Sequence, residues 1–469
     1  MANIRQAGSR PGRSRPFRRV LTGCFQPPVP PPALPLWMVV DERVRLGAPP
    51  VGLDQEWGVI NCSKKTAYGC GKHGQKVLDG LRLRMRLVKP NCITTSIYLE
   101  LNNDALRALR AAFGKGDGPP IPIDGKELHA RGAVSTTSDQ VLVLVVVFRL
   151  RGFGTRIFYM VYDTIDGSLA MVPAPPDPSC DIDGMPKPLA VPRDRSNHGV
   201  GYDLLFLSRK RLTSQPGHPY NTYEDVVYRW TPGAWSEDGG PWRVQRRRFA
   251  NGVHEAFIVE SMFTMKGQAF FADLAQGLIH CDLSTTTEGS VVDFHFIPLP
   301  EDAPLESRWA KVEPEDMGPI NWYRTLSCTS GSIKFVCIDR STWPPENMRL
   351  IQYTLDLSSK KWSKNMELRS VELWKFLGLK KEMLPETVPK CPVLMSDDSL
   401  SLLLPNMRTR KEDSIEDYMC NFKLGQKVRL SWSAHLDHCY YTEPIILPWN
   451  FFKTVHPPVN VKPRRAIFL

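Results

Sequence analysis

The stretch 157–167, IFYMVYDTIDG, decides the predicted fold because four similar segments follow it along the chain. Each is a short apolar run with an aromatic residue or a cysteine near its end, followed by a polar turn, which is typical of a β-strand. The later copies are 224–233 (EDVVYRWTPG), 277–286 (GLIHCDLSTT), 349–362 (RLIQYTLDLSSKKW) and 417–426 (DYMCNFKLGQ).

The landmarks of these segments recur at similar intervals. Tyr162, Tyr228, Cys281, Tyr353 and Cys420 are separated by 66, 53, 72 and 67 residues. A kelch-type unit has about 50 residues, so these spacings fit if loops are inserted. We therefore predict a mainly β fold, a β-propeller-like array of antiparallel sheets with about six blades. A plain multi-sheet β fold is the alternative.

Segments outside the repeat also predict strands and a few short helices. Residues 81–87 alternate Leu or Met with Arg, which places three arginines on one face of a strand. The β-branched run 141–148 predicts a buried strand. Short helices are expected at 104–113 and 370–378, and Trp374 and Leu377 are expected to pack on the last blades.

Charge is concentrated at the two ends of the 469-residue chain. The net charge is +11, but the first 40 residues hold six arginines and no acid, and 453–469 hold four basic residues and no acid. The body is therefore nearly neutral, which argues against a broad nucleic-acid-binding face. We predict a disordered basic and Pro-rich tail (1–36), a propeller-like domain (37–452) and a basic C-terminal tail (453–469).

Targeting signals are weak. No apolar run is long enough to span a membrane, and the N-terminus lacks the 7–15-residue apolar region of a secretory signal. Residues 1–26 have the Arg-rich, acid-free composition of an organelle transit peptide, and the Pro-rich stretch 27–35 is typical of a spacer. The 11 cysteines predict buried free thiols in a reducing compartment. We expect a cytoplasmic or nuclear protein, with organelle targeting as the alternative.

Three motifs in the middle of the chain resemble a known family. Phe271-Ala272-Asp273-Leu274, 277–283 (GLIHCDL) and 296–300 (FIPLP) are similar to the plant domain-of-unknown-function 1618 family, which is abundant in grasses. Residues 331–336, 353–355 and 35–41 also resemble it, and the motif core spans about 225–400. The resemblance implies a propeller like the kelch-type and F-box-associated domains, and it carries no catalytic residues. In the motif, Gly277 predicts a tight turn, and Asp273 and Asp282 are expected to accept backbone N–H bonds.

Several residues have the types, but not the spacing, of known sites. Gly69-Cys70-Gly71-Lys72-His73-Gly74 matches G-x-G-x-x-G, but we predict a strand after it, whereas a dinucleotide site requires a helix. The possible zinc ligands are Cys420, His435, His438 and Cys439, and a weaker set is Cys62, Cys70 and His73; neither has ligand spacing typical of zinc. We therefore predict no catalytic, cofactor or metal residues, and no enzymatic activity.

The best basic and aromatic stretch is 242–249 (WRVQRRRF). Arginines pair with phosphates and aromatic rings stack on bases, so Arg243 to Arg248 together with the basic tails could bind RNA or DNA. The leading hypothesis is a non-enzymatic module whose loops bind an unknown protein or peptide. Nucleic-acid binding is the second hypothesis, and an enzyme without a recognisable signature is the third.

Overall fold

The computed structural model describes most of the chain between residues 37 and 456. The described residues are 37–47, 57–86, 94–115, 119–120, 127–137, 140–175, 187–193, 201–212, 222–233, 240–249, 257–283, 291–304, 319–339, 348–376, 388–395, 397–408, 415–422, 429–432, 445–448, 451 and 455–456. The predicted tail 1–36 lies outside them.

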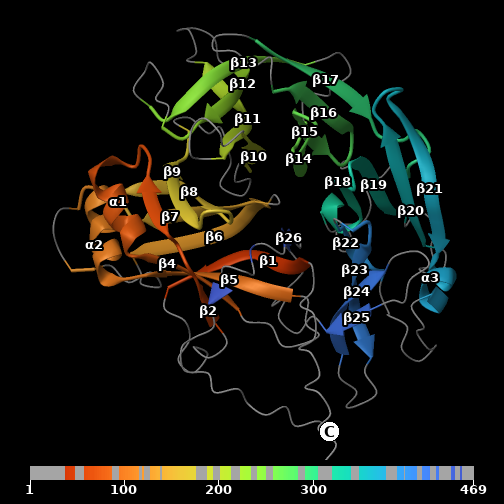
Figure 1. Cartoon of the computed structure of the whole chain (residues 1–469), viewed down its shortest axis with the longest axis horizontal. Helices are drawn as coiled ribbons and strands as arrows, with labels where there is room; N and C mark the ends of the chain where they lie inside the picture. The colour runs from red at the N-terminus through yellow and green to blue at the C-terminus, as the bar shows by residue number, and fades with distance from the viewer. Residues whose placement is uncertain are drawn as a thin grey trace, which may run out of the picture. The chain divides into compact units, whose positions relative to one another are not determined.

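Five antiparallel meanders of four strands each follow one another along the described chain (Figure 1). The first consists of β6 (Leu128–Thr137), β7 (Val141–Leu150), β8 (Gly154–Asp163) and β9 (Ser168–Pro173). The second consists of β10 (Leu189–Pro192), β11 (Tyr202–Leu212), β12 (Thr222–Trp230) and β13 (Trp242–Phe249). The third consists of β14 (Ser261–Met265), β15 (Gln268–Asp273), β16 (Gly277–Asp282) and β17 (Val292–Pro298). The fourth consists of β18 (Arg324–Thr329), β19 (Ser332–Asp339), β20 (Arg349–Asp356) and β21 (Lys361–Arg369). The fifth is β22 (Lys390–Leu394), β23 (Leu400–Arg408), β24 (Ile415–Phe422), β25 (Arg429–Trp432).

The first meander belongs to a larger sheet that includes both ends of the described chain. Its other strands are β1 (Trp37–Leu46), β2 (Trp57–Ile60), β3 (Lys64–Ala67), β4 (Leu81–Arg86), β5 (Thr94–Leu101), β26 (Ile445–Pro448) and β27 (Val455–His456). β26 pairs antiparallel with β1, and β27 pairs with β2 inside the segment predicted as the C-terminal tail. The last strands of the chain therefore complete the first sheet.

Helices α1 (Gly71–Asp79) and α2 (Asn103–Ala112) lie side by side against one face of this sheet (Figure 1). Asn102 caps α2, since its side-chain oxygen accepts a bond from the backbone N–H of Ala105 at 2.8 Å. Apolar positions of both helices point to the sheet, among them Leu78 and Leu109. A third helix, α3 (Ser370–Phe376), follows β21, and a 3₁₀ turn, η2 (Ile320–Trp322), precedes β18.

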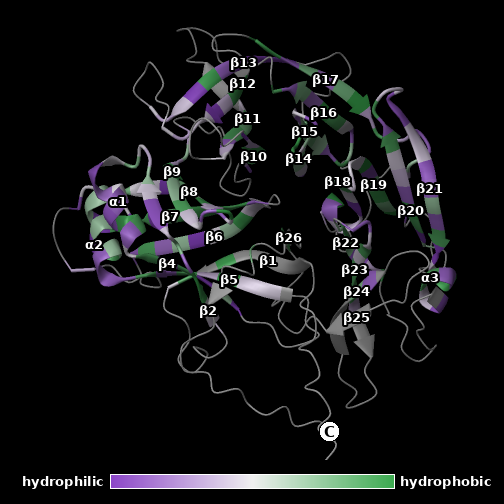
Figure 2. Cartoon of the chain, viewed as in Figure 1, coloured by the Kyte–Doolittle hydropathy of each residue, from purple (hydrophilic) through white to green (hydrophobic). Residues whose placement is uncertain are grey.

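Successive meanders pack face to face through separate apolar clusters, because alternate residues of each strand point to opposite neighbours. Figure 2 shows the apolar residues recurring along the strands. In β7, Val143 packs towards the β10–β13 meander and Leu144 packs under the helices. The predicted strand 141–148 is thus buried on both faces, as its unbroken apolar run indicated.

A tryptophan on the fourth strand of a meander reaches back to the preceding meander in two places. The indole N–H of Trp242, in β13, donates to the carbonyl of Pro173 at the end of β9, at 2.8 Å. The indole N–H of Trp362, in β21, donates to the carbonyl of Pro298 at the end of β17, also at 2.8 Å. The same contact therefore ties together two different pairs of neighbouring sheets.

The five landmark residues all lie on the third strand of their meander. Tyr162, Tyr228, Cys281, Tyr353 and Cys420 belong to β8, β12, β16, β20 and β24, and all five are nearly fully buried. The predicted repeat therefore has the correct phase. The mainly β, propeller-like fold is confirmed, and the remaining strands of the first sheet stand beside the five meanders.

The remaining predictions of secondary structure have mixed outcomes. In β4, Leu81, Leu83 and Met85 are buried while Arg82 is exposed, so the predicted alternation is confirmed. Trp374 packs on the cluster between the last two meanders, as expected, whereas Leu377 lies outside the described residues. The strand expected directly after Gly74 is wrong, because α1 occupies 71–79 before β4 begins. Gly71, Gly74 and the short length of this segment concealed an amphipathic pattern in which Val77 and Leu78 are buried.

Candidate functional site

A cavity of about 200 Å³ lies where the first strands of several meanders approach one another. β6, β14, β18 and β22 all contribute to it, and Lys187, just before β10, does as well. Residues far apart in the chain therefore meet here, from Ser135 in β6 to Leu394 in β22. In β-propellers the first strand of each blade lies nearest the central axis, and this cavity has the corresponding position.

Three of the lining strands are edges of their sheets. β14, β18 and β22 each pair on one side only with another described strand. Their residues in the cavity wall include Ser261, Thr325, Ser327 and Val393. An edge strand presents backbone N–H and C=O groups that can pair with another chain.

Two charged side chains in the cavity wall are held by the backbone of one residue. The guanidinium of Arg324, which is 4% exposed, donates to the carbonyl of Leu274 at 2.8 Å and also to the carbonyl of Pro304. The carboxylate of Glu260 accepts a bond from the N–H of Leu274 at 2.8 Å. The hydroxyl of Ser261 completes the link between β14 and β18 by donating to the carbonyl of Leu326 at 2.6 Å.

Ser135 contributes a different kind of group to the same wall. Its side-chain oxygen is buried, and within the described part of the chain it has no hydrogen-bond partner. The residue as a whole is 6% exposed. A buried hydroxyl without a partner is costly in a folded protein, so it requires an explanation such as a bound water or ligand.

Backbone strain occurs at the cavity as well. Cys391, at the start of β22, has φ of +51°, and the pairing of β22 with β23 shifts register between Lys390 and Val393. A residue other than glycine in this region costs of order 1–3 kcal/mol, and such strain often occurs at binding sites. Sequence reasoning identified none of these cavity residues, because they lie on separate first strands and form no linear motif.

Within the family motif, Asp273 has the structural role that was predicted for it. The carboxylate of Asp273, fully buried, accepts bonds from the backbone N–H groups of Ile258 and Ala275, both at 2.8 Å. Gly277 begins β16 with φ of +152°, and a Cβ there would lie 2.3 Å from the carbonyl oxygen of Ile297. Close approach of β17 thus requires glycine. Asp282 lies exposed at the other end of β16.

The G-x-G-x-x-G stretch does stand between a strand and a helix, contrary to the prediction. β3 precedes Gly69 and α1 begins at Gly71, and both glycines have positive φ. However, β3 pairs in parallel with β9 and not with β4, so β3, α1 and β4 do not form the βαβ unit of a dinucleotide site. A Cβ at Gly69 would meet the ring of Pro241, and one at Gly74 would meet Cys70, so these glycines serve packing.

The residues considered as zinc ligands are not brought together where the structure describes them. Cys420 is fully buried in the apolar cluster between the last two meanders, and His435, His438 and Cys439 lie outside the described residues. Within the described part of the chain, no group of three or more His, Cys, Asp or Glu side chains could hold a metal ion. Cys62 and Cys70 each donate from sulfur to a backbone carbonyl.

The described cysteines are free thiols in buried or half-buried places. Burial raises the pKa of Cys62 to about 11, and the nearby Lys65 opposes this shift only in part. Burial raises the pKa of Cys281 to about 12, and the charge of Asp282 acts in the same direction. Burial likewise raises the pKa of Cys70 and of Cys420 to about 12. These four groups are protonated at neutral pH, which makes them poor nucleophiles.

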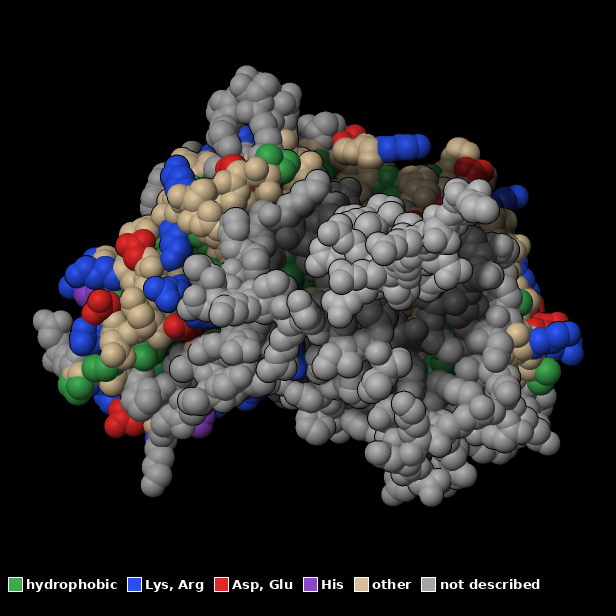
Figure 3. Space-filling model, turned by 60° about the horizontal axis from the view of Figure 1, so that its bottom comes forward, with side chains coloured by type: hydrophobic (Ala, Val, Ile, Leu, Met, Phe, Trp, Pro, Cys, Tyr) green, Lys and Arg blue, Asp and Glu red, His purple; other side chains and the backbone are tan. Residues whose placement is uncertain are grey.

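The arginine stretch lies on β13 and is divided between burial and exposure. Trp242 is buried, Arg243 and Arg247 are half-buried, and Arg246 and Arg248 are exposed. Arg248 forms an ion pair with Asp293 of β17 at 2.7 Å, where the two strands pair in parallel. On the face drawn in Figure 3, the described Lys and Arg side chains are interspersed with Asp and Glu.

Comparison with solved structures finds similarity at low sequence identity. The WD40 domain of SCAP from fission yeast has a TM-score of 0.30 and 12% identity, over 66% of this chain and 65% of that chain. The α-L-arabinofuranosidase from Lactobacillus brevis has a TM-score of 0.28 and 9% identity, over 67% and 88%. This chain thus spans less than two thirds of the length of the first structure.

Other comparisons concern sequence. No curated protein matches the chain. Among the helices that the structure describes, none is both long and apolar enough to cross a membrane. Residues 271–401, which run from the motif in β15 through the fourth meander to β23, match the family described as "Protein of unknown function (DUF1618)", the family that the sequence motifs predicted.

Proposed function

We propose that the chain is a non-enzymatic interaction module that binds an extended segment of a partner protein at the cavity between the first strands. The observation that carries this proposal is the convergence of three sheet edges, β14, β18 and β22, on one cavity. Extended peptides commonly bind by adding to such edges, where the main chain provides affinity and side-chain pockets provide specificity. The kelch-like and F-box-associated character implied by the family resemblance forms part of this proposal.

The size and lining of the cavity limit what it accepts. About 200 Å³ corresponds to roughly seven molecules of liquid water, which suits one inserted side chain with its backbone. Ser135 supplies a hydroxyl without a partner among the described residues, and Thr325 and Ser327 supply further polar groups. A polar side chain presented on an extended segment therefore matches this site better than a large apolar one.

The experiment compares the wild-type chain with a variant whose cavity is filled. Ser327→Phe places a ring in the cavity from a half-buried position, and Thr155→Phe adds the same ring at an exposed position of β8 as a matched control. Each full-length protein is immobilised and exposed to cell extract at low and high salt, with and without nuclease. The retained proteins are then identified, and their binding is measured with purified components.

We expect a protein that binds directly to the wild type and to Thr155→Phe, and whose binding persists at high salt and after nuclease treatment. Its affinity for Ser327→Phe should be at least tenfold lower. Equal binding of that protein to both variants would show that the cavity is not the site. Retention that disappears with salt or nuclease would instead favour the arginine stretch and nucleic acid, because phosphate contacts are strongly salt-dependent.

A further inference from the structure

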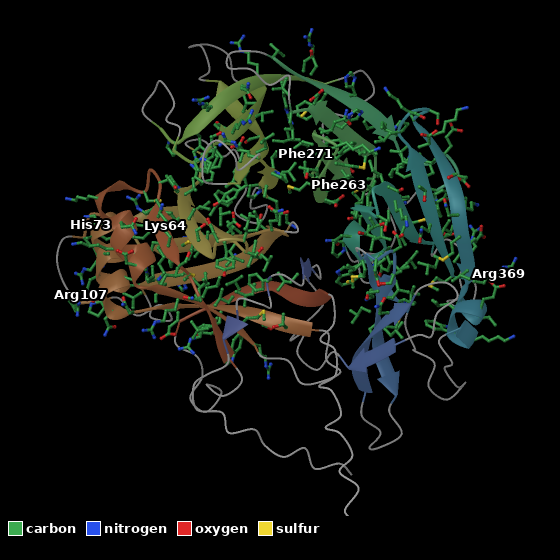
Figure 4. The ribbon with its side chains drawn as sticks, in the orientation of Figure 1. Lys64, His73, Arg107, Phe263, Phe271 and Arg369 are labelled. Atoms are coloured by element: carbon green, nitrogen blue, oxygen red, sulfur yellow. The ribbon has the colours of Figure 1, made fainter. Side chains whose placement is uncertain are left out.

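A row of stacked rings crosses the β14–β17 meander and ends in two histidines. Phe263 stacks on Phe270 with ring centres 5.2 Å apart, and Phe270 stacks on His280 at the same distance. His280 lies 5.3 Å from the ring of His295, its antiparallel partner on β17. Figure 4 labels Phe263 in this meander. The row thus runs from the half-buried Phe263 through two buried rings to the exposed imidazole of His295.

His280 is buried in an unusual way for a polar side chain. It is 9% exposed, and neither of its ring nitrogens has a hydrogen-bond partner among the residues that the structure describes. A neutral imidazole normally satisfies one nitrogen as a donor and the other as an acceptor. Phenylalanine would fit a purely packing role in this row without that cost, so the nitrogens of His280 point to a ligand.

The distance between the two imidazoles suits a shared metal ion. Zinc binds histidine nitrogen at about 2.0–2.1 Å with roughly tetrahedral angles, which places two ligating rings about 5 Å apart between centres. The observed 5.3 Å agrees with this value. We propose that His280 and His295 form a two-imidazole site for a divalent transition-metal ion of the zinc class. It lies outside the cavity proposed as the partner-binding site.

The charges around the pair are mixed. Among the described residues, Lys360, on the turn between β20 and β21, places a positive charge near His280. Alternation along the strands places Asp282 and Asp293 on the same face as the two histidines, and both carboxylates are exposed. Since no third His, Cys, Asp or Glu completes a ligand group among the described residues, water must fill the remaining positions.

The test uses the full-length chain after treatment with a chelator and its removal. Bound zinc is counted by equilibrium dialysis against zinc chloride for the wild type, His280→Phe and His295→Ala. His129→Ala, which removes an exposed histidine from β6, is the matched control. In parallel, diethyl pyrocarbonate labelling of His295 and His129 is followed by mass spectrometry with and without zinc.

The proposal expects the wild type and His129→Ala to bind one more zinc ion than the two site variants, or to bind it at least tenfold more tightly. Zinc should also protect His295, and not His129, from labelling. Equal zinc binding by all four proteins, with His295 labelled at the same rate in zinc, would overturn the proposal. Protection of His295 by inorganic phosphate and not by zinc would also overturn it, in favour of an anion site.

Discussion

Glu260 and Arg324 hold opposite sides of the same residue. The carboxylate of Glu260 accepts from the N–H of Leu274, and the guanidinium of Arg324 donates to its carbonyl, both at 2.8 Å. Leu274 follows β15, whereas Arg324 begins β18, so the contact joins two consecutive meanders at the cavity wall. Hydrogen bonds from a buried charged group contribute more than neutral ones, and loss of the donor leaves carbonyl groups unsatisfied.

We therefore expect Arg324→Met to destabilise the protein by roughly 2–3 kcal/mol, because Leu274 and Pro304 both lose a charged donor. Urea unfolding followed by tryptophan fluorescence measures this change. Arg82→Met, at an exposed position of β4, is the control and should change stability by less than about 0.5 kcal/mol. Equal effects of the two substitutions would contradict the role given to Arg324.

The tryptophan that joins neighbouring meanders gives a second prediction. Trp242→Phe removes the bond to the carbonyl of Pro173 and part of a buried ring that packs on Phe206 and Tyr159. We expect a loss of about 2 kcal/mol, combining the hydrogen bond with the reduced packing. Trp362→Phe removes the equivalent bond to Pro298 from a half-buried position and should cost less. Thermal unfolding measures the stability of both variants. A larger loss of stability in Trp362→Phe than in Trp242→Phe would refute this explanation.

Two ion pairs of very different burial should have very different energetic importance. Asp203 is fully buried and accepts two bonds from Arg229, at 2.6 and 3.0 Å. The side chain of Arg229 is 26% exposed, so water can solvate it when the carboxylate is removed, and Asp203→Ala should cost roughly 1.5–3 kcal/mol, as for hydrogen bonds to a charged group. Asp293→Ala breaks an exposed pair with Arg248 and should cost less than about 1 kcal/mol. Chemical denaturation in low and high salt measures both, and only the exposed pair should be sensitive to salt.

His280 makes stability depend on pH. Its pKa is about 4 in the folded protein, chiefly because of burial, against an ordinary value of 6.5. Between these values the unfolded chain binds more protons, so stability should fall as pH decreases from about 6.5 towards 4. The loss attributable to this residue is at most about 3 kcal/mol. Urea unfolding at pH 7 and pH 5, with chelator present, should show a smaller pH effect in His280→Phe than in the wild type.

Gly277 supplies a prediction inside the family motif. Its φ of +152° and the 2.3 Å approach of a Cβ to the carbonyl oxygen of Ile297 exclude a side chain without movement of β17. Gly277→Ala should therefore destabilise the protein by more than about 1 kcal/mol. Gly152→Ala is the matched comparison, because it also has positive φ but has open space around its Cβ. If both substitutions lower the free energy of unfolding equally, the positive φ alone, and not the close approach of β17, explains why glycine occupies position 277.

Local patterns in the sequence determined the strands and the phase of the repeat. Tyr162, Tyr228, Cys281, Tyr353 and Cys420 could be aligned because each occupies the third strand of a meander and is buried between two neighbours. The alternation of apolar and arginine residues in 81–86 likewise predicted the strand, because its apolar side chains all lie on the buried face. Helix α1 was missed because its short segment carries two glycines, and its packing against the sheet outweighs their low helix propensity.

The candidate sites were decided by tertiary structure. Ser135, Glu260 and Arg324 come from different meanders, and only the packing of successive sheets brings them to one cavity. His280 and His295 are adjacent only through the register of β16 and β17, which depends on the close approach that Gly277 permits. Strand formation follows from the period of neighbouring residues, whereas a site formed by non-local contacts depends on distances that no linear pattern records.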